Sequence, residues 1–269
     1  MGFSLSRPGG QIAVYDDGPA DGPVVVLVSG MGDLASAWDD VVGPLVGAGY
    51  RVVRPELRGH GGSGTSFAEH GVEATAGDIA ALLDHLERTA VVVGCSFAAA
   101  SVAWAAAERP EAVEAVVLVA PEENAEPKPK GARMVSALLR PGWGPPAWAW
   151  FYRQLAKGRR PARFDEHLAA LRADLRRPGH LASLRALALS LVAGTGRHVF
   201  DEITAPTLVV VGDRDPEIGE PRAVVDGFVA RLPDAQGLVV DECGHFPALQ
   251  RPDVLVEALQ GFLSQTAHA

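Results

Sequence analysis

The chain has 269 residues, of which 48% are hydrophobic and 21% are charged, so it can bury a substantial core and does not have a disordered composition. Its formal net charge of −9 disfavours a nucleic-acid partner, because binding to phosphates requires a basic surface. Its two cysteines, Cys95 and Cys243, form neither a disulfide framework nor a zinc pattern, and we interpret both as small buried hydrophobic residues rather than as a redox switch.

No apolar run in the sequence approaches the roughly 18 residues that a membrane-spanning helix needs. The first residues also lack the charged and apolar regions of a signal peptide. We therefore expect no membrane insertion and a cytoplasmic location. Because the chain has only two cysteines, we expect no metal site, and we also expect no cofactor. The sequence leaves the oligomeric state open.

Short β-branched runs in the first 120 residues are typical of strands that are buried on both faces of a sheet. These runs are residues 24–28, 51–54, 90–93 and 115–119. Between them, residues 72–88 carry apolar side chains at helical spacing, and residues 97–108 are rich in alanine, the strongest helix former. This alternation of strand and helix predicts a parallel sheet with right-handed crossovers.

The segment 121–200 differs from the rest because it has no strand pattern and contains predicted amphipathic helices at 164–175 and 181–192. It carries fourteen Lys or Arg residues against six Asp or Glu residues. The favoured interpretation is a solvated helical surface that complements the acidic body, and the alternative is a cationic rim that attracts anionic substrates. Three tryptophans of this segment either line a substrate pocket or pack within the segment: Trp143, Trp148 and Trp150.

The alternation resumes after residue 200 with predicted strands at 207–211 and 237–240 and predicted helices at 221–231 and 252–263. Each of these helices begins with a proline, which the first helical turn tolerates. We therefore predict an α/β protein with a mostly parallel sheet and helices on both faces. Its core comprises residues 1–120 and 201–269, and residues 121–200 form a helical cap, or lid, inserted after strand 6.

Ser96 is the candidate nucleophile of this chain. It lies in the segment Gly94-Cys95-Ser96-Phe97-Ala98, directly after a predicted buried strand and at the start of a predicted helix. A tight strand-to-helix turn forces a serine into strained geometry and leaves its hydroxyl exposed. Gly94 provides the small residue that the turn needs, and Ala98 replaces the more usual glycine.

His245 is the candidate base, because a histidine can accept and return a proton near neutral pH. The segment Gly244-His245-Phe246 follows the last predicted strand, where a loop at the carboxyl end of the sheet can reach Ser96. The base needs a carboxylate to hold it in one tautomer. We favour Asp215, after strand 207–211, on the chain order of serine, acid and histidine and on its placement within the turn. The alternative carboxylates are Asp213, Glu122 and Glu123.

Several motifs resemble, in order, those of the α/β-hydrolase superfamily. They are Ser29-Gly30-Met31-Gly32, residues 56–63, the turn at Ser96, Gly212-x-x-Asp215 and Gly244-His245. The resemblance spans residues 10–265 except for the cap, and it implies the eight-stranded sheet of that fold. It also implies an oxyanion hole formed by the backbone N–H groups of Met31 and Phe97. Two residues depart from the usual pattern: Ser29 replaces a histidine and Glu56 replaces an aspartate.

The resemblance implies a serine hydrolase that cleaves an ester, lactone or thioester bond through an acyl-enzyme. The helical cap and its tryptophans favour a small or medium, partly apolar substrate over a polymer. Serine at position 96 disfavours the epoxide hydrolases and dehalogenases of the superfamily, which use aspartate there. Two alternatives stay open. One is a pathway enzyme that isomerises, cyclises or cleaves a carbon–carbon bond, and the other is a ligand receptor that turns over slowly.

Overall fold

The computed structural model of the protein describes residues 2–122, 126–128, 131–161 and 163–266, in which the chain forms one eight-stranded sheet. The strands are β1 (Gly2–Arg7), β2 (Gly10–Asp17), β3 (Val24–Val28), β4 (Arg51–Pro55), β5 (Ala90–Cys95), β6 (Val113–Val119), β7 (Thr207–Gly212) and β8 (Ala235–Val240). Their order is β1-β2-β4-β3-β5-β6-β7-β8. β2 pairs antiparallel with β1 and β4, and all other neighbours are parallel, which confirms the predicted fold class.

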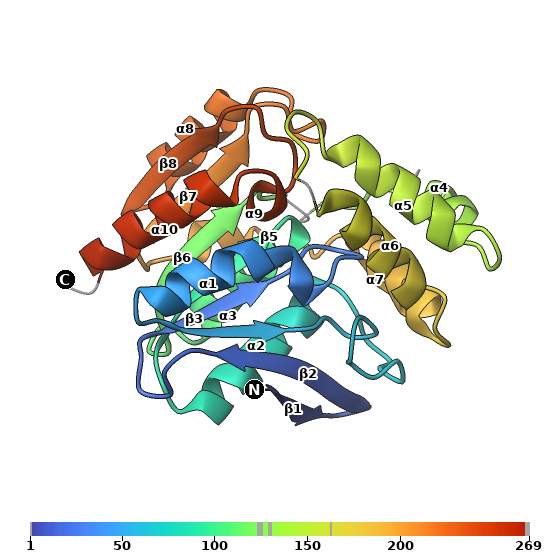
Figure 1. Ribbon diagram of the computed structural model, residues 1–269, viewed down its shortest axis with the longest axis horizontal. Helices are drawn as coiled ribbons and strands as arrows, with labels where there is room; N and C mark the ends of the chain where they lie inside the picture. The colour runs from blue at the N-terminus through green and yellow to red at the C-terminus, as the bar shows by residue number, and fades with distance from the viewer. Residues whose placement is uncertain (1, 123–125, 129–130, 162, 267–269) are drawn as a thin grey trace.

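Helices cover both faces of the sheet (Figure 1). They are α1 (Asp39–Gly47), α2 (Val72–Leu86), α3 (Phe97–Glu108), α4 (Gly131–Leu138), α5 (Gly144–Leu155), α6 (Phe164–Asp174), α7 (His180–Ala193), α8 (Pro221–Arg231), α9 (Pro247–Gln250) and α10 (Pro252–Thr266), with the short 3₁₀ helices η1 (Ala35–Trp38) and η2 (Val199–Glu202). α2, α3 and α8 pack on one face, and α1 and α10 pack on the other.

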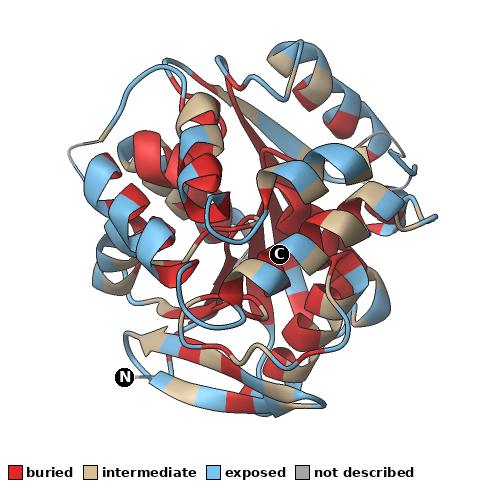
Figure 2. Cartoon of the chain, turned by 90° about the vertical axis from the view of Figure 1, so that its right-hand side faces the viewer, coloured by how far each residue is buried: buried red, intermediate tan, exposed pale blue. Residues whose placement is uncertain are grey.

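The parallel strands are continuously apolar because both of their faces are covered. In β3, Val24, Val26 and Val28 belong to the hydrophobic cluster under α2, α3 and α8, whereas Val25 and Leu27 belong to the cluster under α1 and α10. Successive side chains of a strand point to opposite faces, so each face receives every second residue. Figure 2 shows the buried strands between helices whose outer sides are exposed.

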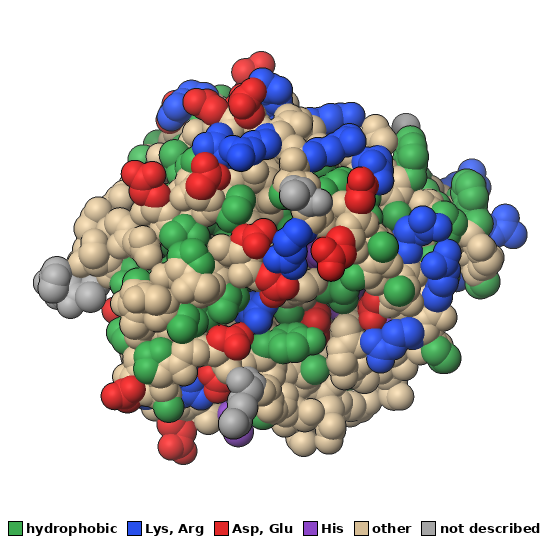
Figure 3. Space-filling model, in the orientation of Figure 1, with side chains coloured by type: hydrophobic (Ala, Val, Ile, Leu, Met, Phe, Trp, Pro, Cys, Tyr) green, Lys and Arg blue, Asp and Glu red, His purple; other side chains and the backbone are tan. Residues whose placement is uncertain are grey.

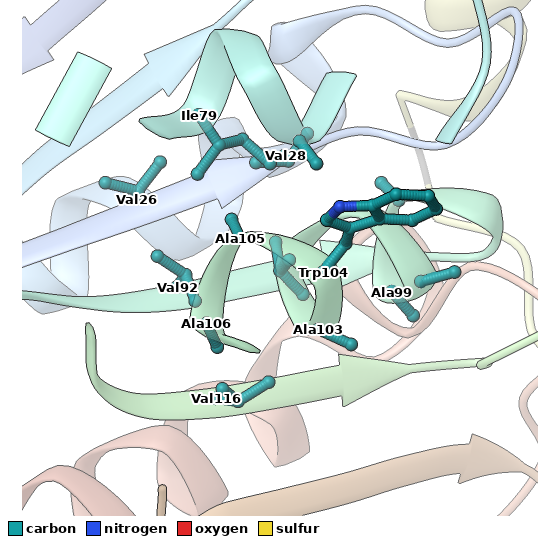
Figure 4. Close-up of a cluster of buried hydrophobic side chains, with 14 of the residues drawn as sticks. Val26, Val28, Ile79, Val92, Ala99, Ala103, Trp104, Ala105, Ala106 and Val116 are labelled. Carbon is teal, nitrogen blue, oxygen red and sulfur yellow. The ribbon is translucent and has the colours of Figure 1, made fainter. Parts of the chain in front are cut away.

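α3 packs closely on the sheet because most of its side chains are small. Figure 4 shows Ala103, Ala105 and Ala106 of this helix beside Val92 of β5 and Val116 of β6, all within one buried cluster. Alanine methyl groups let the helix backbone approach the strands, and they favour the helical conformation. The start of α3, where Ser96 precedes the helix, is therefore held against the carboxyl end of β5.

The segment between β6 and β7 contains α4 to α7, and it is joined to the sheet through α5 and α6. Tyr152 of α5 and Phe164 and Leu168 of α6 belong to the same hydrophobic cluster as Val93 and Cys95 of β5. α4 differs, since none of its residues is buried. The division into a core and a cap stays a prediction, although the helices lie within the boundaries expected for the cap.

α5 is a helix that the sequence pattern obscured. Prolines 145 and 146 interrupt the apolar pattern there, and both lie in the first turn of the helix, where a missing N–H costs nothing. The predicted helices at 164–175 and 181–192 correspond to α6 and α7 within one residue at each end. Across the residues that the structure describes, no helix is both long and apolar enough to cross a membrane.

The core assignment predicts that Ile79→Ala destabilises the protein. Ile79 of α2 is fully buried in the cluster of Figure 4, so the truncation removes apolar contacts and leaves a cavity. We expect the free energy of unfolding to fall by about 2–5 kcal/mol in urea denaturation. The control Val229→Ala, on the exposed side of α8, should change it by about 0.5 kcal/mol or less. Equal losses in the two variants would contradict this core.

Candidate active site

Ser96 lies in a strained turn between β5 and α3. Its backbone has φ 58° and ψ −127°, a left-handed conformation that residues other than glycine rarely adopt. The turn is fixed by a hydrogen bond from the Ser96 N–H to the carbonyl of Val119 on β6, with a length of 2.8 Å. A side chain at Gly94 would overlap the carbonyl oxygen of Ala98, which explains the small residue at that position.

The loop of residues 29–34 lies against this turn. A Cβ atom added to Gly30 would be 3.4 Å from the Cβ of Ser96, so the loop lies in direct contact with the turn at this glycine. Two backbone N–H groups beside Ser96 are available to a ligand. Within the part of the chain that the structure describes, neither the N–H of Met31 nor that of Phe97 donates a hydrogen bond.

Both departures from the family motifs anchor the 29–34 loop. The Ser29 hydroxyl donates to the carbonyl of Leu34 at 3.0 Å and accepts from the indole N–H of Trp38 at 3.1 Å. The Glu56 carboxylate accepts the N–H of Ala35 at 3.1 Å. Burial raises the pKa of Glu56 to about 7. Ser29 therefore anchors Leu34, just before η1, and Trp38, at its end, and Glu56 anchors Ala35, its first residue. These contacts involve η1 and the residue before it rather than the Ser96 turn.

His245 and Asp215 form a buried hydrogen-bonded pair. Nδ1 of His245 is 2.7 Å from Oδ2 of Asp215, and both side chains are almost fully buried. Since an ionised carboxylate only accepts hydrogen bonds, the neutral imidazole must carry its proton on Nδ1, which leaves the lone pair on Nε2. The alternative acid Asp213 instead accepts the N–H of Cys243. Glu122 forms an ion pair with Lys128, and Glu123 lies outside the described residues.

Two glycines bring the acid and the histidine together. Any side chain at Gly212 would overlap the carbonyl oxygens of Cys243 and Gly244, so the loops after β7 and β8 pack backbone against backbone. Gly244 in turn lies against the carbonyl of Leu155, at the end of α5, which also accepts the N–H of His245 at 3.1 Å. The glycine of the Gly-x-x-Asp motif thus allows the two loops to touch, and the glycine of the Gly-His motif allows the histidine loop to touch the end of α5.

Gln250 is a buried brace of the histidine loop that sequence reasoning missed. Its side-chain oxygen accepts the N–H groups of Gly244 and Phe246, on either side of His245. Its side-chain nitrogen donates to the carbonyls of Lys157 and Arg159, which follow α5. A glutamine just before the predicted helix at 252–263 has no sequence signal for this role, because its partners are backbone groups, two of them from a distant segment.

Glu217 is a second residue that the sequence analysis missed, and it lies beside the imidazole. Its Oε2 is 3.5 Å from Nε2 of His245, on the side of the ring opposite Asp215. In the described structure no hydrogen bond joins the Ser96 hydroxyl to His245. Burial of the ring lowers the pKa of His245, but the hydrogen bond and charge of Asp215, followed by the charge of Glu217, outweigh burial and raise the pKa above the usual histidine value.

The structure separates the three tryptophans of the inserted segment. Trp148 is buried and donates its indole N–H to the carbonyl of Gly32 at 2.9 Å, next to Met31. Trp143 and Trp150 are 57% and 61% exposed. Trp148 therefore contacts the 29–34 loop, whereas the other two indoles face solvent. The substrate-binding role of the three tryptophans stays a prediction.

The basic side chains of the inserted segment gather on its outer surface, over α4 to α7 (Figure 3). Arg176, Arg177 and Arg185 help to line a cavity of about 730 Å³ whose lining includes neither Ser96 nor His245. Arg163 forms ion pairs with Asp39 and Asp40 of α1. These contacts favour the interpretation that the basic segment complements the acidic body.

Cys95 and Cys243 are buried and unpaired. Burial raises the pKa of both thiols, that of Cys243 to about 12, which disfavours the reactive thiolate. Among the described residues, no group of three or more His, Cys, Asp or Glu side chains is arranged to hold a metal ion.

Comparison with known proteins identifies the family. Residues 25–258 match the sequence profile of the Alpha/beta hydrolase family. A pimeloyl-[acyl-carrier protein] methyl ester esterase of Aromatoleum aromaticum is 31% identical over 254 residues, which cover 87% of this chain and 97% of the relative. The protein therefore belongs to the alpha/beta hydrolase family.

Solved structures of hydrolases share the fold. A thermophilic esterase from Thermogutta terrifontis has a TM-score of 0.82 at 22% identity, with 99% of each chain covered. The enol-lactonase from Burkholderia xenovorans LB400 has a TM-score of 0.80 at 22% identity, with 97% of this chain and all of the lactonase covered. At this identity the likeness establishes the architecture of the sheet and its helices.

The contact between Glu217 and the imidazole predicts that Glu217→Gln lowers the pKa of His245. Removing the negative charge withdraws one of the interactions that favour the imidazolium ion, so the ring should lose its proton at a lower pH. An NMR titration of the histidine Cε1 protons measures the change. The control Glu220→Gln alters an exposed carboxylate of the same loop and should leave the titration unchanged. A His245 pKa that is the same in both variants would contradict this proximity.

Proposed function

We propose that the protein is a serine hydrolase that cleaves an ester-like bond with Ser96 as nucleophile, His245 as base and Asp215 as the acid that orients the base. The observation that carries this proposal is the strained Ser96 turn, together with the buried Asp215–His245 pair at the carboxyl ends of neighbouring parallel strands. Such placement is typical of nucleophile, acid and base in this fold.

In the proposed reaction, the Ser96 hydroxyl attacks the carbonyl carbon while Nε2 of His245 takes the hydroxyl proton. The leaving alcohol or thiol then receives that proton from His245, and the acyl group stays on Ser96. In the second half, water attacks the acyl-enzyme and gives a proton to Nε2. His245 then returns this proton to the Ser96 oxygen as the bond to the acyl group breaks, and the carboxylic acid product leaves. Asp215 holds the imidazole and stabilises its positive charge, and no cofactor takes part. Catalytic hydrogen bonds are often long in unliganded enzymes, and the contact between Ser96 and His245 closes when substrate binds.

The backbone N–H groups of Met31 and Phe97 form the proposed oxyanion hole. Phe97 follows Ser96 in the chain, and Met31 follows Gly30, which lies against Ser96. Both N–H groups lack an internal acceptor in the described structure. Phe97 is the first residue of α3, where the partial positive charge of the helix start also favours an anion. These donors are fixed before the reaction, so they stabilise the tetrahedral oxyanion without reorganisation.

The proposed substrate is a small or medium, partly apolar ester, lactone or thioester. The relative from Aromatoleum aromaticum is named a methyl ester esterase, and the similar Burkholderia structure is an enol-lactonase. The apolar character is supported by Met31, which packs against the cluster that contains Leu139 and Trp148. In this proposal, residues 121–200 act as the cap that covers the site.

A fluorophosphonate probe tests the nucleophile. The probe should label the wild-type protein and leave Ser96→Ala unlabelled, because the phosphorus atom reacts only with an activated serine. Intact-mass spectrometry measures the adduct. Ser101→Ala is a matched control, since this buried serine lies on α3, the helix that Ser96 precedes, and the variant should label like wild type. Full labelling of Ser96→Ala would reject the assignment.

Two aspartates of one loop allow a test of the acid. Asp215→Asn should lower kcat for a p-nitrophenyl ester by about a thousandfold or more, because the imidazole loses its orienting carboxylate. Asp213→Asn should retain most activity, since the Asp213 carboxylate accepts the N–H of Cys243 and pairs with Arg214 rather than with His245. A larger loss in Asp213→Asn would reverse the assignment.

Short p-nitrophenyl esters also separate the proposed function from its alternatives. Multiple turnover by the wild type supports the hydrolase. Stabilisation by a ligand without turnover would indicate a receptor, and labelling of Ser96 without ester hydrolysis would indicate another reaction on the same residues.

A further inference from the structure

A second buried carboxylate–histidine pair lies next to the proposed oxyanion hole. Oδ1 of Asp33 is 2.7 Å from Nε2 of His167, and the hydroxyl of Tyr152 donates to Oδ2 of Asp33 at 2.8 Å. Each of the three residues is at least 95% buried. Asp33 belongs to the 29–34 loop, whereas Tyr152 and His167 belong to α5 and α6 of the inserted segment.

The carboxylate of Asp33 also shapes its own loop. Its Oδ1 accepts the N–H of Leu34 at 2.8 Å, and the Asp33 N–H donates to the carbonyl of Gly30 at 3.2 Å, which closes a turn around Met31. The indole of Trp148 covers Gly32 in that turn and donates to its carbonyl. The position of the Met31 N–H is therefore set by groups that α5 and α6 hold.

Tyr152 connects this loop with the loop of the proposed base. Its ring stacks on the ring of Phe246 with centroids 4.0 Å apart and an interplanar angle of 9°. Phe246 follows His245 directly, and the end of α5 accepts the His245 N–H through the carbonyl of Leu155. One face of α5 thus contacts both the 29–34 loop and the histidine loop, which come from opposite ends of the core sequence.

The charges in this cluster strengthen its hydrogen bonds. Burial lowers the pKa of His167, but the charge of Asp33 and the hydrogen bond to it outweigh burial and raise the pKa above the usual histidine value. Burial, together with the Asp33 charge, raises the pKa of Tyr152 well above its usual value, so its hydroxyl keeps its proton and donates. Hydrogen bonds to an ionised carboxylate are shorter and stronger than neutral ones.

We propose that Asp33, Tyr152 and His167 form a positioning unit that fixes the 29–34 loop relative to the histidine loop. In this arrangement, the Met31 N–H donates a hydrogen bond to the oxyanion while His245 takes the proton of the Ser96 hydroxyl. The unit touches no reacting atom and rests on the proposed function of Ser96. Its hydrogen bonds stabilise the transition state by placing a donor, because small misplacements of catalytic groups have large effects on rate.

The positioning unit makes a kinetic prediction that a purely structural role does not. Tyr152→Phe keeps the stacked ring and removes only the hydroxyl, so Phe246 retains its contact. We expect kcat for a p-nitrophenyl ester to fall about ten- to a hundredfold, with KM changed about twofold or less, because ground-state binding does not use the oxyanion donor. The affinity for a trifluoromethyl ketone, which forms a tetrahedral adduct with serine, should fall in proportion to kcat.

Two further variants keep the test decisive if Tyr152→Phe folds poorly. Asp33→Asn removes the charge with little change of shape, and it should show the same loss of kcat. Arg163→Gln is the matched control, because Arg163 joins α6 to α1 through Asp39 and Asp40 without touching the 29–34 loop. Its kcat and inhibitor affinity should equal those of the wild type, whatever its melting temperature.

The outcomes separate this proposal from the proposed function. If the wild type is neither labelled by the fluorophosphonate nor active on esters, both proposals are overturned. If the wild type is labelled and active but Tyr152→Phe and Asp33→Asn lower only the melting temperature, with kcat and inhibitor affinity unchanged, the positioning unit alone is overturned. The positioning unit is supported if kcat and inhibitor affinity fall together in Tyr152→Phe and Asp33→Asn, while both quantities are unchanged in Arg163→Gln.

Discussion

The close approach of two backbones at Gly212 and Gly244 is the constraint on which the rest of the site depends. The loops that follow β7 and β8 touch through main-chain atoms, and a methyl group on Gly212 would overlap the carbonyl oxygens of Cys243 and Gly244. This contact sets the 2.7 Å separation between Asp215 and His245 and leaves both side chains buried. The parallel pairing of β7 with β8 brings the two loops to the same edge of the sheet. The geometry of the Asp215–His245 pair therefore depends on the register of these strands.

Much of this arrangement could be predicted from the sequence, because it depends on local signals that recur at fixed places. Continuous valine runs identified the buried parallel strands, and a glycine before Ser96 marked the turn between β5 and α3. The antiparallel strands β1 and β2 gave no such run, since most of their residues are partly or fully exposed. Helix α5 was obscured for a different reason, because its first turn contains the prolines that usually interrupt a helix.

The parts of the site that the sequence did not reveal are those that depend on contacts between distant segments. Glu217 reaches the far side of the imidazole, and Gln250 holds the loop around it, yet neither residue type nor spacing distinguishes them from ordinary surface or helix positions. The same holds for Asp33, whose partners lie more than a hundred residues away on α5 and α6. A one-dimensional pattern identifies the groups that recur in a motif, whereas their supports become visible only when the chain is folded.

The helices between β6 and β7 differ in what they support, and this difference matters for protein engineering. α5 and α6 share the hydrophobic cluster of the sheet. α5 contacts both the 29–34 loop and the histidine loop, and α6 contacts the 29–34 loop, whereas α4 buries no side chain and packs mainly on α7. Substitutions at the outward positions of α4 should therefore cost little in folding. Substitutions at the inward positions of α5 would instead disturb the core of the sheet together with the 29–34 loop and the histidine loop.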